Sequence, residues 1–301
     1  MREHLDTLLS ELKKLRQQGV SSLLIEPDTL SLLESSVQDI AAKSATQPPT
    51  REISPTPPLQ ADSKPEQSTD KSHDPASKAR QKDFHVIPEV VLPEGDKASQ
   101  WNWLRKRVQE CEVCNRHVRP GKKVVFGVGN LDADIFFCGE APGEEEEIQG
   151  EPFVGPAGQL LTRIIQTMGL SREQVYIGNI MNWRPETDQP FGNRPPTEQE
   201  MAFCLPYLKA QVAVVRPKVI VALGATAVNG LLGYDPKRSI TRSHGQWHDF
   251  EGIPTLISFH PSYILRNGTN RVKRLIWEDM LTVMQRLRMP ITEKQQNFFK
   301  S

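Results

Sequence analysis

Three polar residues with complementary chemistry accompany separate apolar runs in the sequence. Glu140 follows the run DIFFC, Asn179 lies near the end of VYIGNIM, and His260 follows TLISF. A carboxylate can position a water, an amide can read the edge of a polar ring, and an imidazole can donate a hydrogen bond to a developing anion. Each residue alone is more often a cap or a turn residue, but the three together predict one site.

The segment GEAPGEEEEIQGEPFVGPAGQLL, which contains the first of these residues, is rich in glycine and glutamate. Glycine allows the backbone to approach a ligand closely. Phe153 offers a flat ring that either packs in the core or stacks on a planar ligand. The segment therefore predicts one wall of a binding pocket.

The chain has four cysteines, too few for a disulfide framework at 301 residues. Cys111 and Cys114 form a Cys-x-x-Cys pair, which in a reducing compartment indicates metal or redox chemistry. Cys138 falls inside the run DIFFC, where a small buried hydrophobe is the ordinary interpretation.

These residues need a scaffold, and the sequence predicts one from about residue 98 onward. Four apolar runs alternate with helical patterns, and Thr197 and Glu200 have the spacing of a capping box. The predicted strands are 134–138, 175–181, 219–223 and 255–259, and the predicted helices are 100–111, 158–168, 197–215, 225–232 and 272–287. This alternation predicts an α/β fold with a parallel sheet covered on both faces, whose strand ends bring the three polar residues together.

The first 95 residues have a different composition. Residues 1–42 contain an amphipathic helix but too little apolar surface for a core, and the Pro- and Ser-rich residues 43–95 predict a disordered linker. We expect a folded domain at 96–290 and a tail at 291–301. The N-terminal helix is expected to be a docking element.

The chain carries 37 basic and 37 acidic residues, which excludes a uniformly basic nucleic-acid coat protein. Residues 236–275 nevertheless hold seven basic residues against two acidic ones, which predicts a local positive surface. No stretch approaches the ~18 apolar residues of a membrane span, and the N-terminus lacks the apolar segment of a secretory signal. We therefore expect a cytoplasmic protein.

Four motifs occur in order at the predicted strand ends: GEAPG-x-x-E-E-x-Q-G-x-PFVG-x-AGQLL, YI-x-N, VIVALG and HPSY-x-LR. They resemble the bacterial and archaeal family 4 uracil-DNA glycosylases over residues 98–288. The resemblance implies a three-layer α/β/α sandwich around a four-stranded parallel sheet. It also implies a monofunctional DNA-repair hydrolase that flips uracil out of DNA and cleaves its N-glycosidic bond, leaving an abasic site.

The resemblance implies roles for individual residues. His260 would stabilise the departing uracil, and Glu140 would position the attacking water, with Glu146 as the second candidate. The residues that would bind the base are Gly139, Ala141, Phe153 and Asn179, and those that would contact the DNA backbone are Ser262 and Arg266.

Family 4 enzymes typically carry a 4Fe–4S cluster on four cysteines, so the resemblance implies a cofactor. Cys111, Cys114 and Cys204 match three of the ligand positions, but the fourth position is Trp183. Three interpretations stay open: a 4Fe–4S cluster, a zinc ion held by the three cysteines and His117, or no metal, with Trp183 packed into the space.

Two other functions stay open. One is a non-catalytic protein that binds uracil or damaged DNA. A related branch binds uracil-DNA covalently through a histidine in the loop after the second strand, and the loop RPETDQPFGNRPP here has none. The other is a glycosylase for another deaminated base such as hypoxanthine. The implied partner is single-stranded or mismatched uracil-containing DNA, with a repair or replication protein as the expected partner of the N-terminal helix.

Overall fold

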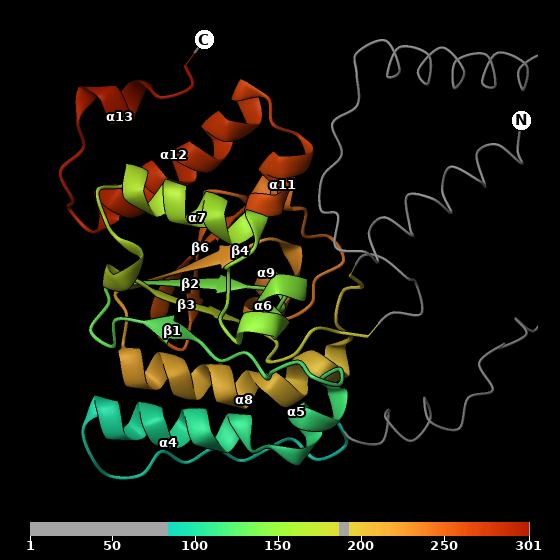
Figure 1. Cartoon of the computed structure of the whole chain (residues 1–301). Helices are drawn as coiled ribbons and strands as arrows, with labels where there is room; N and C mark the ends of the chain where they lie inside the picture. The colour runs from blue at the N-terminus through green and yellow to red at the C-terminus, as the bar shows by residue number, and fades with distance from the viewer. Residues whose placement is uncertain (1–83, 187–192, 301) are drawn as a thin grey trace, which may run out of the picture. The chain divides into compact units, whose positions relative to one another are not determined.

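A computed structural model describes residues 84–186 and 193–300 of the chain (Figure 1), so the predicted helix within residues 1–42 lies outside the described residues. The strands are β1 (Val128–Gly129), β2 (Ile135–Gly139), β3 (Tyr176–Asn179), β4 (Val219–Leu223), β5 (Trp247–Phe250) and β6 (Ile253–Ser258). The helices are α4 (Lys97–Gln109), α5 (Glu112–His117), α6 (Glu144–Gln149), α7 (Pro156–Thr167), η2 (Arg172–Gln174), α8 (Glu198–Val215), α9 (Ala225–Leu232), α10 (Ile240–Ser243), α11 (Pro261–Arg266), α12 (Asn270–Arg286) and α13 (Glu293–Asn297).

The strands form one sheet in the order β1-β3-β2-β4-β6-β5. The central strands β3, β2, β4 and β6 are parallel, which confirms the predicted parallel sheet. The sheet has six strands rather than the four expected, because β1 and β5 add an antiparallel strand at each edge. β1 has only two residues and β5 has the polar sequence WHDF, so neither contains the apolar run that predicts a strand.

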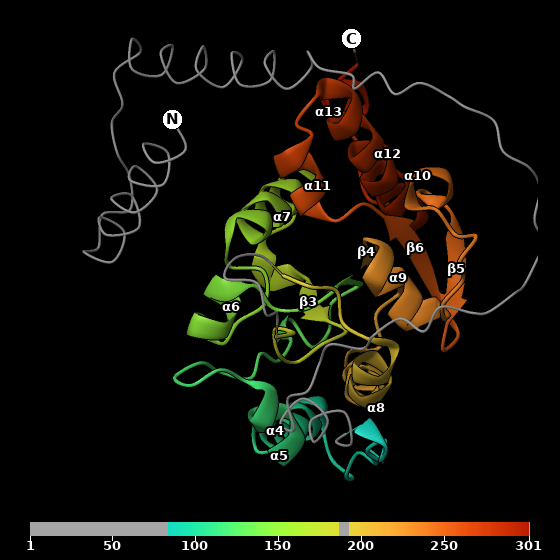
Figure 2. The same ribbon diagram turned by 90° about the vertical axis from the view of Figure 1, so that its right-hand side faces the viewer.

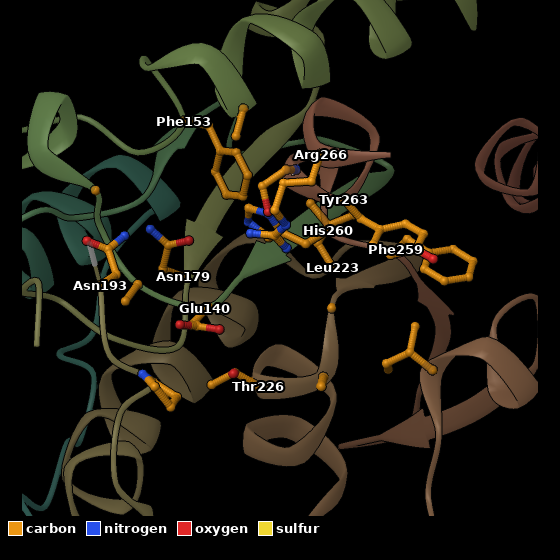
Figure 3. Close-up of a pocket in the computed structure, with 18 of the residues that line it drawn as sticks. Glu140, Phe153, Asn179, Asn193, Leu223, Thr226, Phe259, His260, Tyr263 and Arg266 are labelled. Atoms are coloured by element: carbon orange, nitrogen blue, oxygen red, sulfur yellow. The ribbon is translucent and has the colours of Figure 1, made fainter. Parts of the chain in front are cut away.

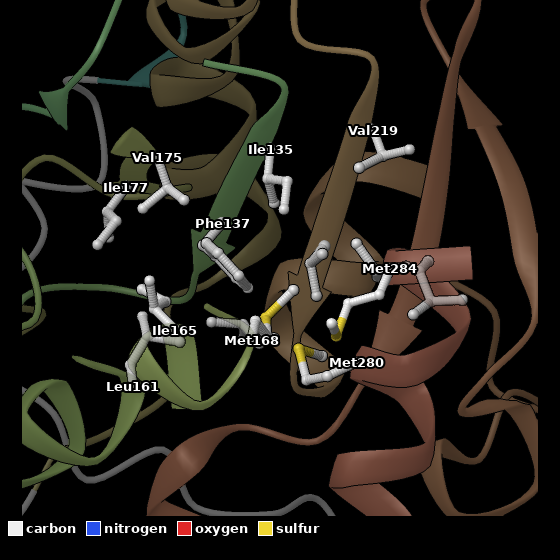
Figure 4. Close-up of a cluster of buried hydrophobic side chains, with 14 of the residues drawn as sticks. Ile135, Phe137, Leu161, Ile165, Met168, Val175, Ile177, Val219, Met280 and Met284 are labelled. Atoms are coloured by element: carbon white, nitrogen blue, oxygen red, sulfur yellow. The ribbon is translucent and has the colours of Figure 1, made fainter. Parts of the chain in front are cut away.

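Both faces of the central strands are buried, and alternate residues point to opposite faces. Ile135 and Phe137 of β2 pack with α7 and α12 (Figure 4), whereas Phe136 and Cys138 pack with α8 and α9. The three-layer α/β/α arrangement is therefore confirmed, and Cys138 is part of the core. Among the described residues, no helix has the length and apolarity needed to cross a bilayer.

The helical layer on the α8 side has a second tier. α4 packs along α8, and α5 lies beside α4 (Figure 2). Phe84, Val90 and Leu92, from the segment expected as linker, pack against this tier. At the other end, the residues expected as a tail contain α13, and Gln295 Nε2 donates to the backbone oxygen of Thr167 at 2.7 Å. The folded part thus reaches beyond both expected boundaries.

The N-terminus of α8 shows how local sequence positions the site. Thr197 is the N-cap and Glu200 completes the predicted capping box. Both oxygens of Glu200 also accept from Arg194, at 2.7 and 2.8 Å. These bonds fix the chain next to Asn193, which borders the cavity described below.

Candidate active site

A cavity of about 560 Å³ opens at the carboxyl ends of the parallel strands (Figure 3). Glu140 enters it just after β2, Asn179 from the end of β3, and His260 just after β6. Phe153, from the segment between α6 and α7, forms one side, and Ala141 also lines the space. The structure therefore brings together the acid, the amide and the imidazole that the sequence places at separate strand ends.

His260 is the N-cap residue of α11. The backbone N–H of Ser262 donates to His260 Nδ1 at 3.2 Å, and Ser262 Oγ lies 2.9 Å from the same nitrogen. Because a backbone N–H only donates, Nδ1 must accept, and the neutral ring carries its proton on Nε2. Burial, together with the smaller effect of the Arg266 charge, lowers the pKa of His260 to about 4. At neutral pH, His260 is therefore an uncharged Nε2–H donor.

Glu140 also lines the cavity, and Figure 3 shows its carboxylate between Asn179 and Thr226. Burial raises the pKa of Glu140, while the Thr226 hydroxyl and the Arg266 charge oppose this rise. A carboxylate with a raised pKa accepts a proton from water more readily than an exposed glutamate does.

Asn179 and Phe153 approach each other across Gly139. A Cβ at Gly139 would lie 2.5 Å from both Asn179 Oδ1 and Phe153 Cζ, so a larger residue at this position would push the amide or the ring aside. The buried Asn179 Oδ1 has no hydrogen-bond partner among the described residues. The Phe153 ring lies 5.6 Å from the His260 ring, tilted by 31°. An unpaired amide oxygen beside an aromatic face suits recognition of a flat polar ring.

Glu146, the second candidate for positioning water, uses both carboxylate oxygens to hold backbone. Oε1 accepts from the N–H groups of Val154 and Gly155 at 3.0 and 2.9 Å, and Oε2 accepts from that of Gly143 at 3.0 Å. These bonds fix the chain directly after Phe153, whose φ of 54° is unusual for a non-glycine residue. Both oxygens of Glu146 are therefore engaged with backbone donors next to the Phe153 ring.

Ser262 and Arg266, the expected contacts to the DNA backbone, both border the cavity. The Ser262 hydroxyl is engaged with the His260 ring. Arg266 ends α11 and is exposed, so its guanidinium can reach a phosphate outside the cavity.

Asn193 and Thr226 are among the polar residues of the cavity that sequence reasoning missed. Asn193 Oδ1 accepts from Arg184 Nε at 2.7 Å, and Arg184 Nη1 lies 3.2 Å from Glu147 Oε1, with both charged side chains buried. Since a guanidinium only donates, the NH₂ group of Asn193 is left to face the cavity. Thr226 follows β4, so the strand-end rule could have found it; nothing in the spacing of residues 147, 184 and 193 indicates their contacts.

A buried network fixes the chain just before His260. Asp279 of α12 accepts from Ser258 Oγ at 2.7 Å and lies 2.9 Å from His244 Nδ1. Burial raises the pKa of Asp279 to about 6, against the effect of these two hydrogen bonds. The His244 ring also contacts Phe259, with ring centroids 4.8 Å apart. The end of β6 is therefore tied to α12.

The three cysteines that match ligand positions lie in one apolar cluster with Trp183. Cys111 Sγ accepts from Tyr207 Oη at 3.5 Å, and burial raises the pKa of the Cys204 thiol. Within residues 84–186 and 193–300, no three His, Cys, Asp or Glu side chains are placed to hold a metal ion. Trp183 offers only an N–H donor at the fourth position. This donor set does not fit a 4Fe–4S cluster with one thiolate per iron, nor the tetrahedral zinc site with His117.

Comparison with known proteins agrees with this geometry. The profile of the Uracil DNA glycosylase superfamily matches residues 126–281. A type-4 uracil-DNA glycosylase of Thermotoga maritima is 46% identical over 178 residues, which cover 59% of this chain and 89% of that protein. The type-4 enzyme of Archaeoglobus fulgidus is 38% identical over 53% of this chain and 80% of its own length. The type-4 enzyme of Saccharolobus solfataricus is 38% identical over 63% of this chain and 88% of its own length. The family name is compatible with an iron–sulfur cluster, although the described donor residues are not. The chain belongs to the uracil-DNA glycosylase superfamily, and within it to the type-4 uracil-DNA glycosylases.

Proposed function

We propose that the cavity at the strand ends is where this type-4 uracil-DNA glycosylase excises uracil, with the residue roles derived below. The enzyme hydrolyses the N-glycosidic bond of uracil in DNA and leaves an abasic site. The observation that carries the assignment is the state of His260: Ser262 occupies Nδ1, so Nε2–H is the donor available to a ligand.

Asn179 supplies base recognition in this proposal. Its unpaired Oδ1 accepts the N3–H of uracil, and its amide N–H donates to O4. Cytosine presents an acceptor at N3 and a donor at N4, so both ends of the amide would face like groups. Each buried group left unpaired costs ~1–3 kcal/mol. Phe153 stacks on the face of the base and holds it edge-on to Asn179.

His260 stabilises the leaving group. When the C1′–N1 bond breaks, its electron pair moves to uracil, and negative charge develops on O2. The Nε2–H of His260 donates to this oxygen, which is the logic of an oxyanion hole. A pKa of about 4 keeps the ring uncharged, so the site does not have to bury a cation before the base enters.

Glu140 acts on the sugar side. It positions the water that adds to C1′ of the oxocarbenium-like sugar and takes up the proton that this water releases. Its ionised form also balances the positive charge of the sugar. Because the group must be ionised to do this, its raised pKa predicts loss of activity at acidic pH.

We further propose that Arg266 and the basic residues of 236–275 hold the DNA backbone. Single-stranded and mismatched uracil should be preferred, because flipping an unpaired base costs less than flipping a paired one.

Such an enzyme works where the DNA lies, which in a bacterial cell is the cytoplasm. A repair or replication partner for the N-terminal helix stays a prediction, since that helix lies outside the described residues.

A strand-cleavage assay tests the function. The full chain is incubated with oligonucleotides carrying U·G, U·A, single-stranded U, T·G or hypoxanthine, and abasic sites are revealed by alkaline cleavage. We expect cleavage at uracil in all three contexts and none at T·G or hypoxanthine. Cleavage at hypoxanthine without cleavage at uracil would assign a different base. No lysine lines the described cavity, so borohydride should trap no enzyme–DNA adduct.

A matched pair of histidine variants tests the assignment of His260. His260→Ala should slow excision by ~10²–10³, whereas His248→Ala, which changes an exposed histidine on β5, should not. Excision at the parental rate by His260→Ala would refute the proposed role.

A further inference from the structure

Trp183 stands where the family places a cluster ligand, and it is the largest fully buried side chain in the described part of the chain, 1% exposed. Its ring stacks on His117, with centroids 5.3 Å apart and planes 21° apart, and on Phe84, at 6.0 Å and 5°. Phe84 and His117 also stack on each other at 4.9 Å. Phe203 closes the group edge-on, 6.2 Å from Trp183. We name these four residues the aromatic stack.

The thiols beside the aromatic stack have the surroundings of core side chains. Cys114 and Cys204 are fully buried among apolar neighbours, and Cys111 is half-buried next to the Tyr207 hydroxyl. A free cysteine in such a place packs as a small hydrophobe. The three thiols therefore lie within or against the same apolar cluster as Trp183, Phe84 and Phe203.

The aromatic stack also anchors a segment that the active site needs. Trp183 lies between Asn179 at the end of β3 and Arg184, which holds Asn193 at the cavity. In a cluster-bearing relative, a metal–thiolate bond at this position would fix the segment. Here, burial and ring stacking are what fix it, and aromatic pairs contribute beyond the area that they bury.

We propose that the aromatic stack takes the structural place of the iron–sulfur cluster in this chain, which folds and holds its active-site segment without a metal. The inference rests on family membership and on packing around Trp183, and not on the roles proposed for the cavity residues. It resolves the three interpretations left open by the sequence in favour of a metal-free site.

Metal content is the first test, and it does not depend on activity. The full chain is purified without air, and iron, sulfide and zinc are measured per chain. We expect each to be far below one per chain, with no visible colour and no change of Tm on adding a chelator. Cys111→Ser should leave the Tm within a few degrees of the parent. Stoichiometric iron or zinc that Cys111→Ser removes would overturn the proposal.

Substitution of Trp183 is the second test. Trp183→Phe keeps a stacking ring and removes an indole N–H that has no hydrogen-bond partner among the described residues, so its Tm should stay close to that of the parent. Trp183→Ala opens a cavity in the core and should lower the Tm by about 6–20 °C. A parental Tm for Trp183→Ala would show that the stack anchors nothing. If that variant does not fold, the phenylalanine variant and the metal content still decide.

Discussion

Replacing Glu146 with glutamine separates a positioning role from a chemical one. The carboxylate accepts three backbone N–H bonds, two on Oε1 and one on Oε2. A glutamine amide keeps one oxygen for two of these donors and turns its NH₂ toward the N–H of Gly143. An unpaired buried donor costs ~1–3 kcal/mol, and two charge-assisted bonds become neutral ones, so the variant should lose about 2–4 kcal/mol of unfolding free energy.

That loss corresponds to a fall in Tm of about 4–16 °C for a folded part of this size. The chain after Phe153 is also released, and a misplacement of about 1 Å in a positioning group can cost ~10² in rate. Thermal unfolding and single-turnover excision should therefore both decline for Glu146→Gln. Glu145→Gln, an exposed glutamate in the same helix, is the matched control and should change neither. A large rate loss at parental Tm would refute the reasoning and give Glu146 a direct part in the reaction.

Five further outcomes are expected. Asn179→Asp should abolish most uracil excision while the Tm stays near parental, since the donor to O4 is lost and a charge faces the base; unchanged excision would make Asn179 structural. Glu140 has a raised pKa, so single-turnover rates should fall as the pH drops through a value above the usual glutamate range. Thr226→Val should move this fall in rate to still higher pH, because the Thr226 hydroxyl lowers the pKa of Glu140. A fall at the same pH as in the parent would show that Thr226 does not affect the pKa of Glu140. The losses in His260→Ala and Glu140→Gln should be less than additive in the double variant if both act on one transition state, as single-turnover rates can measure. Asp279→Ala leaves the Ser258 hydroxyl and the His244 ring without their shared acceptor and should lower unfolding free energy by ~2–4 kcal/mol in denaturant titrations; a parental midpoint would contradict it.

Local patterns predicted the elements that carry strong local signals. The apolar run of β4 and the helix α9 lie where the sequence places them, and Thr197 and Glu200 form the expected capping box. β5 escaped prediction because its residues are polar and its pairing with β6 depends on a turn at Glu251 and Gly252, where φ is 54° and 78°.

The convergence of Glu140, Asn179 and His260 was predictable, because the ends of parallel strands meet at one edge of a sheet. The contacts of Glu146 were not, because its three N–H partners are chosen by the path of the loop and not by residue type. Trp183 shows the same limit: its type excludes a thiolate ligand, but only the folded chain shows the rings that surround it.

The order of strands in the sheet also sets the order in which the active site is completed during synthesis. Chains emerge from the ribosome N-terminus first. Glu140 directly follows β2 and Asn179 ends β3, and these two strands are neighbours in both sequence and sheet. His260 follows β6, a late strand that pairs with β4 and β5, and Asp279, which contacts Ser258 at the end of β6, comes later still. A nascent chain that ends before β6 therefore has the amide proposed to read the base but lacks the donor proposed for the leaving group. Removal of uracil by an incomplete enzyme is avoided by topology, because excision in this proposal requires the last part of the chain.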